Sequence, residues 1–189
     1  MNRSQVQFGQ PAPAVSKKIE SRMNEMVREF IAASPFCVLA TSNEEGACDA
    51  SPKGGSPGFV QVLDERRLLI PDVAGNKLFQ SYENVDSNPS AGLLFLLPGC
   101  DWTVRVNGAA CPVDTSNSDE LGTRTDVLWK DENTRVIQGL LIDVHEAYAH
   151  CPRAFLFSNL WETRTIEEAK ANDANQHWFK RYQQALKAP

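Results

Sequence analysis

The sequence predicts a mainly β protein, an antiparallel sheet or barrel with helices flanking it. Short strand-like segments follow one another from residue 36 to residue 144, with turn-forming residues between them. Helical periodicity is confined to the two ends of the chain and to short stretches between strands. Such a pattern is typical of antiparallel sheets and barrels. The length of 189 residues suits one core, so we predict a single domain over residues 1–189.

The ends of the chain have different patterns. Residues 1–14 contain glycine and prolines without periodicity, which predicts a flexible arm. Residues 15–33 place apolar side chains on one helical face and end at Ser34-Pro35, which predicts an N-terminal helix. Residues 165–186 predict a polar C-terminal helix.

Between the ends, alternating or continuous apolar runs predict strands at residues 36–42, 47–53, 59–63, 67–71, 91–97, 103–107 and 136–144. The run at 91–97 is apolar throughout, so we expect it to be buried on both faces. Short helices are predicted at 76–87 and 151–160. Residues 115–130 favour a helix without a clear period.

The charge balance limits the partners of the protein. Nineteen Lys and Arg residues oppose 24 Asp and Glu residues, a net charge of -5. That balance argues against a nucleic-acid binder, which needs a basic surface, but leaves room for a small phosphorylated ligand. No apolar run approaches the roughly 20 residues that cross a bilayer, and charges interrupt the first 30 residues. We therefore expect a cytoplasmic protein with no membrane partner.

The cysteines and histidines give little sign of a metal site. The five cysteines form no CxxC pair, so we interpret them as small buried hydrophobic residues. His145, His150 and Cys151 are close in sequence but match no closed zinc spacing. We expect no metal.

Two loops and one strand carry the candidate chemistry. The loop from Ser51 to Gly58 has small residues and Lys53, so its backbone can approach a ligand. Gly75-Asn76-Lys77 is predicted at a helix N-terminus, which favours an anion. Arg105 is a cation in the middle of a predicted strand. Together these features indicate a phosphate pocket, although each also has a plain structural interpretation as a turn, a solvated lysine or an arginine paired with Asp101.

The order of these motifs resembles the pyridoxamine 5'-phosphate oxidase-like, FMN-binding split-barrel family, in a subgroup distinct from the true oxidase. The resemblance covers Phe36 to about Val113 and continues weakly to Trp161. It rests on the succession F-x-V-L-A-T-S-x-x-x-G, D-x-S-P-K-G, P-G-F-V-x-V, L-x-I-P-D-x-x-G-N-K, N-P-x-x-G-L-L-F-L-x-P-G and V-R-V-N-G.

The resemblance implies an antiparallel split β-barrel of the FMN-binding type that forms a homodimer, with FMN at the subunit interface. It implies a cofactor site made by Ser51, Lys53, Ile70, Pro71, Asn76, Lys77, Arg105 and Trp161. Trp161 is expected to come from the partner subunit.

The activity that the resemblance implies is that of an FMN-dependent oxidoreductase acting on a small molecule. The sequence contains no recognisable hydrolase or nucleotide-binding motif and no convincing general acid or base, so the catalytic residues are unassigned. Two alternatives stay open at this point: a flavin storage or sensing protein without turnover, and a split-barrel enzyme that uses a deazaflavin or handles haem.

Overall fold

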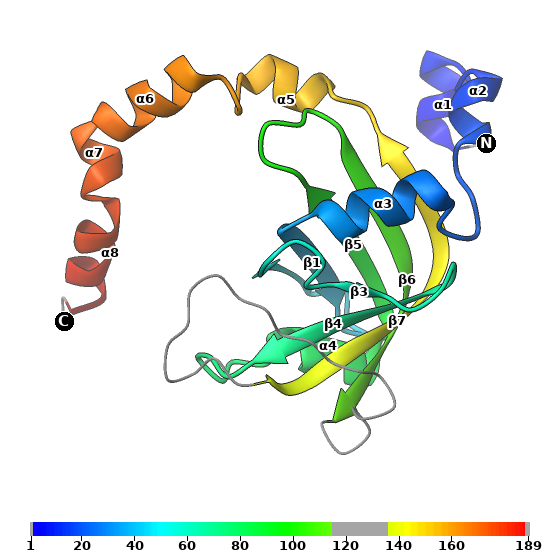
Figure 1. The fold of residues 1–189 in the computed structure, drawn as a ribbon, viewed down its shortest axis with the longest axis horizontal. Coiled ribbons are helices and arrows are strands. Elements are labelled where there is room, and N and C mark those ends of the chain that lie inside the picture. The colour runs from blue at the N-terminus through cyan, green and yellow to red at the C-terminus, as the bar shows by residue number, and fades with distance from the viewer. Residues whose placement is uncertain (1, 115–135, 188–189) are drawn as a thin grey trace. The chain divides into compact units, whose positions relative to one another are not determined.

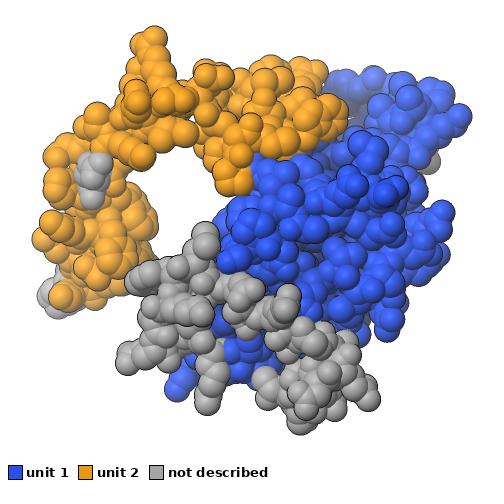
Figure 2. All heavy atoms as spheres, in the orientation of Figure 1, with its two compact units in different colours: residues 1–97, 103–150 blue, residues 98–102, 151–189 orange. Residues whose placement is uncertain are grey.

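The computed structural model describes residues 2–114 and 136–187. Their contacts divide the chain into two compact units: residues 1–97 with 103–150, and residues 98–102 with 151–189 (Figure 2). Compact units are not by themselves domains, so the single domain over 1–189 remains a prediction. The helix predicted at 115–130 lies outside the described residues.

The first unit contains a seven-stranded antiparallel sheet with the order β2-β1-β5-β6-β7-β4-β3 (Figure 1). Its strands are β1 Phe36–Ser42, β2 Cys48–Gly54, β3 Gln61–Val62, β4 Arg67–Val73, β5 Ser90–Leu96, β6 Thr103–Asp114 and β7 Val136–His150. The prediction of a mainly β protein with flanking helices is confirmed. Strands β6 and β7 extend beyond the ranges predicted for them, 103–107 and 136–144. Strand β7 pairs with both β6 and β4 along its length, which stabilises the longer strands.

Strand β5 corrects one expectation. Ala91, Leu93 and Phe95 are buried, whereas Leu94 and Leu96 on the opposite face are only half-buried. The prediction that this strand is buried on both faces was therefore wrong for the single chain. Its outer face continues onto β1, where Phe36 is exposed.

Two helices complete the core on the inner face of the sheet. Helix α3 (Glu25–Ala33) buries Val27 and Ile31, and helix α4 (Gln80–Ser87) buries Tyr82 and Val85. These side chains join one apolar cluster with those of the sheet, among them Leu39, Leu68, Ile70, Leu93, Phe95, Val106, Leu140 and Ile142.

The segment predicted as one helix over 15–33 is divided in the structure. Helix α1 (Arg3–Phe8) precedes it, helix α2 (Pro13–Lys17) covers only its first residues, and Glu20 then forms a backbone bridge with Ala147 of β7. Helix α3 starts only after Asn24, whose side-chain oxygen accepts a hydrogen bond from the Val27 N–H at 3.0 Å. Pairing with the sheet and a strong N-cap thus divide a continuous apolar periodicity into two helices.

The second unit consists of α5 (Arg153–Ser158), α6 (Thr163–Ala171), α7 (Asp173–Gln176) and α8 (Trp178–Lys187). The helix predicted at 165–186 is interrupted at Asn172, which has an extended backbone and follows the last residue of α6. No helix among the described residues has the length and apolar character to span a bilayer.

Candidate functional site

The candidate site lies at the seam of the sheet, where strands from its two ends approach each other. Strand β2 is at one edge of the sheet order and β4 is near the other. Lys53 on β2 and Asp72 on β4 nevertheless form an ion pair with 3.1 Å between Nζ and Oδ1. Since Lys53 is opposite the buried Cys37 in the strand register, its side chain is directed to the core side of the sheet.

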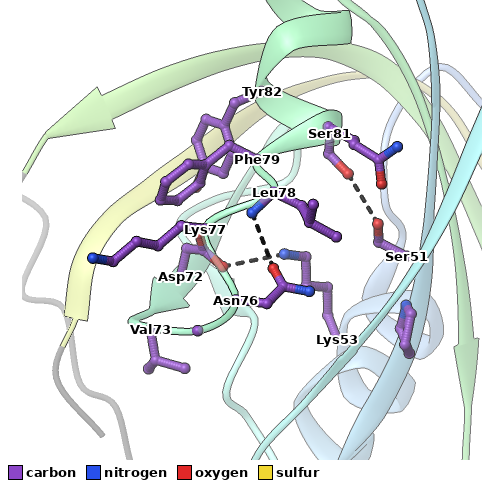
Figure 3. A pocket seen from close by; sticks show the side chains of 13 residues that line it. Ser51, Lys53, Asp72, Val73, Asn76, Lys77, Leu78, Phe79, Ser81 and Tyr82 are labelled. Atoms are coloured by element: carbon purple, nitrogen blue, oxygen red, sulfur yellow. Dashed lines mark hydrogen bonds and ion pairs between the residues drawn. The ribbon is translucent and has the colours of Figure 1, made fainter. Parts of the chain in front are cut away.

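A pocket of about 330 Å³ opens beside this ion pair (Figure 3). Its walls come from β2, from the end of β4, from the loop that follows β4 and from the start of α4. They include Ser51, Lys53, Asp72, Asn76, Lys77, Leu78, Phe79, Ser81 and Tyr82.

The loop between β4 and α4 has an unusual backbone. Lys77 and Phe79 both have positive φ angles, 61° and 50°, although neither is glycine. The Asn76 side-chain oxygen accepts a hydrogen bond from the Leu78 N–H at 3.1 Å, which stabilises the turn around Lys77. Left-handed residues of this kind cost about 1 kcal/mol or more each and cluster at ligand-binding sites. This loop also delays the start of α4 to Gln80, so Gly75-Asn76-Lys77 does not form the helix N-terminus as predicted.

Hydroxyl groups from two elements meet a carboxylate at the rim of the pocket. Ser51 Oγ donates to Asp49 Oδ2 at 2.8 Å, and Ser81 Oγ donates to the same oxygen at 3.0 Å. The two hydroxyl oxygens lie 3.1 Å apart. The network therefore joins β2 to the first turn of α4.

A second pocket of about 170 Å³ adjoins the first and shares Pro52, Lys53, Asp72 and Val73 with it. Gly54, Phe59 and Pro71 complete its lining. The larger pocket is lined by cationic and hydroxyl groups, with Lys77 on one side and Ser51 and Ser81 on the other (Figure 3). The smaller pocket adds the apolar side chains of Phe59 and Pro71 next to the Lys53–Asp72 ion pair. Such a site fits an amphipathic ligand with an anionic group at one end.

Two ionisable groups beside the site are held in their neutral forms. Burial raises the pKa of the Tyr82 hydroxyl strongly, and the nearby Asp72 carboxylate adds to the effect. Among the described residues this hydroxyl makes no hydrogen bond of ordinary geometry, and the Asp72 carboxylate is the acceptor that lies close to it. Burial also raises the pKa of the Cys37 thiol to about 12, an effect that Lys53 partly offsets.

The structure brings some of the predicted site residues together and separates others. Ser51, Lys53, Asn76 and Lys77 line the larger pocket, and Pro71 lines the smaller one. Ile70 is a core residue that is 2% exposed.

Arg105 and Trp161 are placed elsewhere. Arg105 lies on the outer face of β6, opposite the buried faces of Val104 and Val106, and donates to the Tyr148 hydroxyl at 3.0 Å. The predicted convergence of Arg105 with Lys53 and Lys77 does not occur within the chain, because strand alternation places Arg105 on the other face. Trp161 belongs to the second unit, where its indole N–H donates to the Cys100 carbonyl at 3.0 Å and its ring stacks on Phe155.

Asp72, Ser81 and Tyr82 also line the larger pocket and were not predicted from the sequence. Alternation along β4 could have identified Asp72, because it follows the core residue Ile70 by two positions and shares its face. No sequence signal marks the contact of Ser81 with Ser51, since it depends on how α4 packs on the sheet.

Comparisons with known proteins agree with this architecture. A sequence profile of the pyridoxamine 5'-phosphate oxidase family matches residues 23–136. No curated protein matches the sequence.

Among solved structures, a variant of HupZ from Group A Streptococcus is similar, with a TM-score of 0.50 and 14% identity over 68% of this chain and 99% of that chain. A proposed pyridoxamine 5'-phosphate oxidase from Lactobacillus delbrueckii has a TM-score of 0.49 and 20% identity, covering 68% of this chain and 95% of its own. A conserved protein from Corynebacterium diphtheriae has a TM-score of 0.47 and 18% identity over 70% and 96%. The likeness to HupZ shows a shared fold. Because the family profile spans more than half of the sequence and the strands carry the expected motifs, the chain belongs to the pyridoxamine 5'-phosphate oxidase family.

Proposed function

We propose that the protein binds FMN in the seam pocket and uses it as an oxidoreductase, transferring electrons to or from a small molecule. The observation that carries the proposal is the continuity of a cationic, hydroxyl-lined pocket with an apolar one. FMN has the matching shape, a phosphate at one end of a polyol chain and a flat ring at the other. Family membership supports the same cofactor.

The residues present fit such a ligand. Lys77 would anchor the phosphate, the hydroxyls of Ser51 and Ser81 would contact the ligand from another side of the pocket, and Phe59 with Pro71 would form the wall beside the ring. Bound FMN supplies reversible uptake of electrons. The chain supplies phosphate anchorage, orientation and an apolar wall.

We further propose that the protein is a homodimer with the flavin site at the subunit interface. The outer faces of β1 and β5 support the dimer, since Phe36 is 37% exposed and Val38, Leu94 and Leu96 are only half-buried. The place of the flavin site at the interface is proposed from family membership. Paired registers place these four apolar side chains side by side on one face. A two-fold partner is the commonest way to cover such a face. Light scattering should give twice the chain mass, and a monomer that still holds FMN would contradict the arrangement.

A specific observation favours one second candidate, flavin storage or sensing without turnover. Among the described residues that line the larger pocket there is no histidine or cysteine, and the one carboxylate is paired with Lys53. Addition of NADH or NADPH to the flavin-loaded protein separates the two functions. Bleaching of the flavin followed by reoxidation with an acceptor supports the oxidoreductase, and an unreactive flavin supports storage.

The absorption spectrum of the freshly purified protein, before and after incubation with FMN and gel filtration, tests the cofactor. Flavin bands that elute with the protein support the proposal. Haem bands or a deazaflavin spectrum would contradict FMN as the cofactor and support haem or a deazaflavin instead.

A further inference from the structure

The two lysines of the larger pocket are in different electrostatic states. Lys77 is exposed, and among the described residues it forms no ion pair. Lys53 is already paired with Asp72 at 3.1 Å, and the two side chains are only 20% and 17% exposed. A partly desolvated pair of this kind has a stronger attraction than one in water. Lys53 is therefore neutralised by Asp72, whereas the ammonium of Lys77 points away from this pair (Figure 3).

Asp72 is fixed from both sides. Its Oδ1 faces Lys53, and its Oδ2 accepts a hydrogen bond from Gln138 Nε2 at 3.4 Å. Gln138 is the register partner of Asp72 on β7, so the sheet itself holds the carboxylate in place. Because Asp72 cannot turn away without losing both contacts, a phosphate group must compete with it for Lys53.

The charge around the pocket supports the same conclusion. Ser51 and Ser81, whose hydroxyls line the larger pocket, both donate to Asp49. The lining thus contains two cations and one carboxylate, with a second carboxylate directly behind the serines. A phosphate dianion beside Lys53 and the serines is therefore repelled by Asp72.

We propose that Asp72 is a specificity-determining residue: by holding Lys53, it limits the affinity of the pocket for phosphate and sets how strongly FMN is preferred to riboflavin. This inference rests on the proposed function. The same ion pair also joins β2 to β4, so its test must separate ligand preference from stability.

The test is the ratio of the riboflavin dissociation constant to that of FMN, measured by flavin fluorescence quenching. In Asp72→Asn this ratio rises about tenfold, because the substitution removes the charge that competes for Lys53 and keeps the shape of the side chain. Asp86→Asn is the matched control, since Asp86 is exposed on α4 and does not line the pocket. It makes the same change in net charge and leaves the ratio within about twofold of wild type. A ratio in Asp72→Asn that is unchanged or lower overturns the proposal, because a structural role alone does not change the preference between two ligands that differ only in phosphate.

A second pair of variants keeps the proposal falsifiable if Asp72→Asn does not fold. Lys53→Gln leaves Asp72 without its cation, so the ratio falls about tenfold. The double variant Lys53→Gln with Asp72→Asn removes both charges and returns the ratio to within about threefold of wild type. If the ratio in the double variant is as low as in Lys53→Gln, Lys53 anchors the phosphate directly and the proposal fails.

Inorganic phosphate separates this inference from the proposed function. It should raise the melting temperature of the flavin-free protein, and Asp72→Asn should reach the same rise at about one tenth of the phosphate concentration. If phosphate behaves so but no flavin binds, the proposed function fails and Asp72 still controls anion affinity. If FMN binds and neither phosphate nor the ratio responds to Asp72→Asn, the inference fails alone.

Discussion

Lys53 Nζ and Asp72 Oδ1 lie 3.1 Å apart, although Lys53 is on β2, the first strand of the sheet order, and Asp72 is on β4, the second to last. The pair therefore lies where the sheet curves so that β2 comes close to β4. In the described residues these two strands do not pair through their backbones. A seam of this kind exposes a polar pocket next to an apolar core. Both pockets of the candidate site are lined by this pair.

Lys77 should anchor the phosphate of FMN. Lys77→Ala removes one charge-assisted contact, worth about 1.5–3 kcal/mol, which weakens FMN roughly 10–150-fold. Riboflavin affinity and the melting temperature of the flavin-free protein should change little, because Lys77 is exposed. Lys17→Ala, an exposed lysine on α2, is the control for loss of a positive charge. Equal losses for both flavins would show that Lys77 does not contact the phosphate.

Cys37 should make the protein less stable at alkaline pH. Its thiol has an ordinary pKa of 9.0, whereas burial raises the pKa in the folded chain to about 12. Between these values the folded state retains a proton that the unfolded chain has released, so stability falls as pH rises, by up to about 1.4 kcal/mol per pH unit. Urea unfolding between about pH 8.5 and 9.5 measures this slope where Tyr82, whose ordinary pKa is 10.0, still contributes little. Cys37→Ala should flatten it, and an identical slope in both proteins would assign the effect to other groups.

The same burial should protect Cys37 from thiol reagents. Cys48, Cys111 and Cys151 are exposed, so they should react with a disulfide reagent in the native protein. Cys37 should react only after unfolding. Mass spectrometry of the modified peptides checks this, and rapid native labelling of Cys37 would contradict the packing of β1.

The hydroxyl of Tyr82 should be dispensable for folding. It is buried without a hydrogen-bond partner among the described residues, an arrangement that costs about 1–3 kcal/mol. Tyr82→Phe retains the ring in the core and should raise the free energy of unfolding by about 1 kcal/mol. A clear loss of stability would show instead that the hydroxyl donates a hydrogen bond to the nearby Asp72 carboxylate.

Gly108 should be required where β6 and β7 change register. The shift falls between Asn107 and Gly108, and a Cβ at Gly108 would overlap the backbone carbonyl of Asp143. Gly108→Ala should therefore destabilise the protein by more than about 2 kcal/mol, because backbone must move to admit the methyl group. Gly75→Ala is the matched control, as its Cβ would meet nothing closer than 3.9 Å. Similar melting temperatures for the two variants would contradict the register of β6.

The strands were predictable because turn residues and apolar runs act locally. The hairpin of β1 and β2, for example, is closed at Gly46, whose φ is +86°. Helix boundaries were harder, since tertiary contacts determine them: pairing of Glu20 with Ala147 divides the N-terminal helix, and two left-handed residues delay α4.

The site was predictable where its residues are close in sequence and unpredictable where the fold creates it. Ser51 with Lys53 and Asn76 with Lys77 were identified from local motifs. The meeting of Lys53 with Asp72 depends on the curvature of the whole sheet, so sequence spacing does not reveal it. Arg105 was predicted at the site from its local motif, but the fold places it on the opposite face of the sheet, where it bonds to Tyr148.

A calorimetric titration of the flavin-free protein with FMN and, separately, riboflavin and FAD tests the central claim most directly. The seam pocket predicts one FMN per chain with a dissociation constant in the micromolar range or below. Riboflavin should bind more weakly because it lacks the phosphate, and FAD should bind more weakly because its phosphate carries a bulky adenylate. Equal affinity for FMN and riboflavin, or no heat of binding with FMN at micromolar protein, would contradict the account.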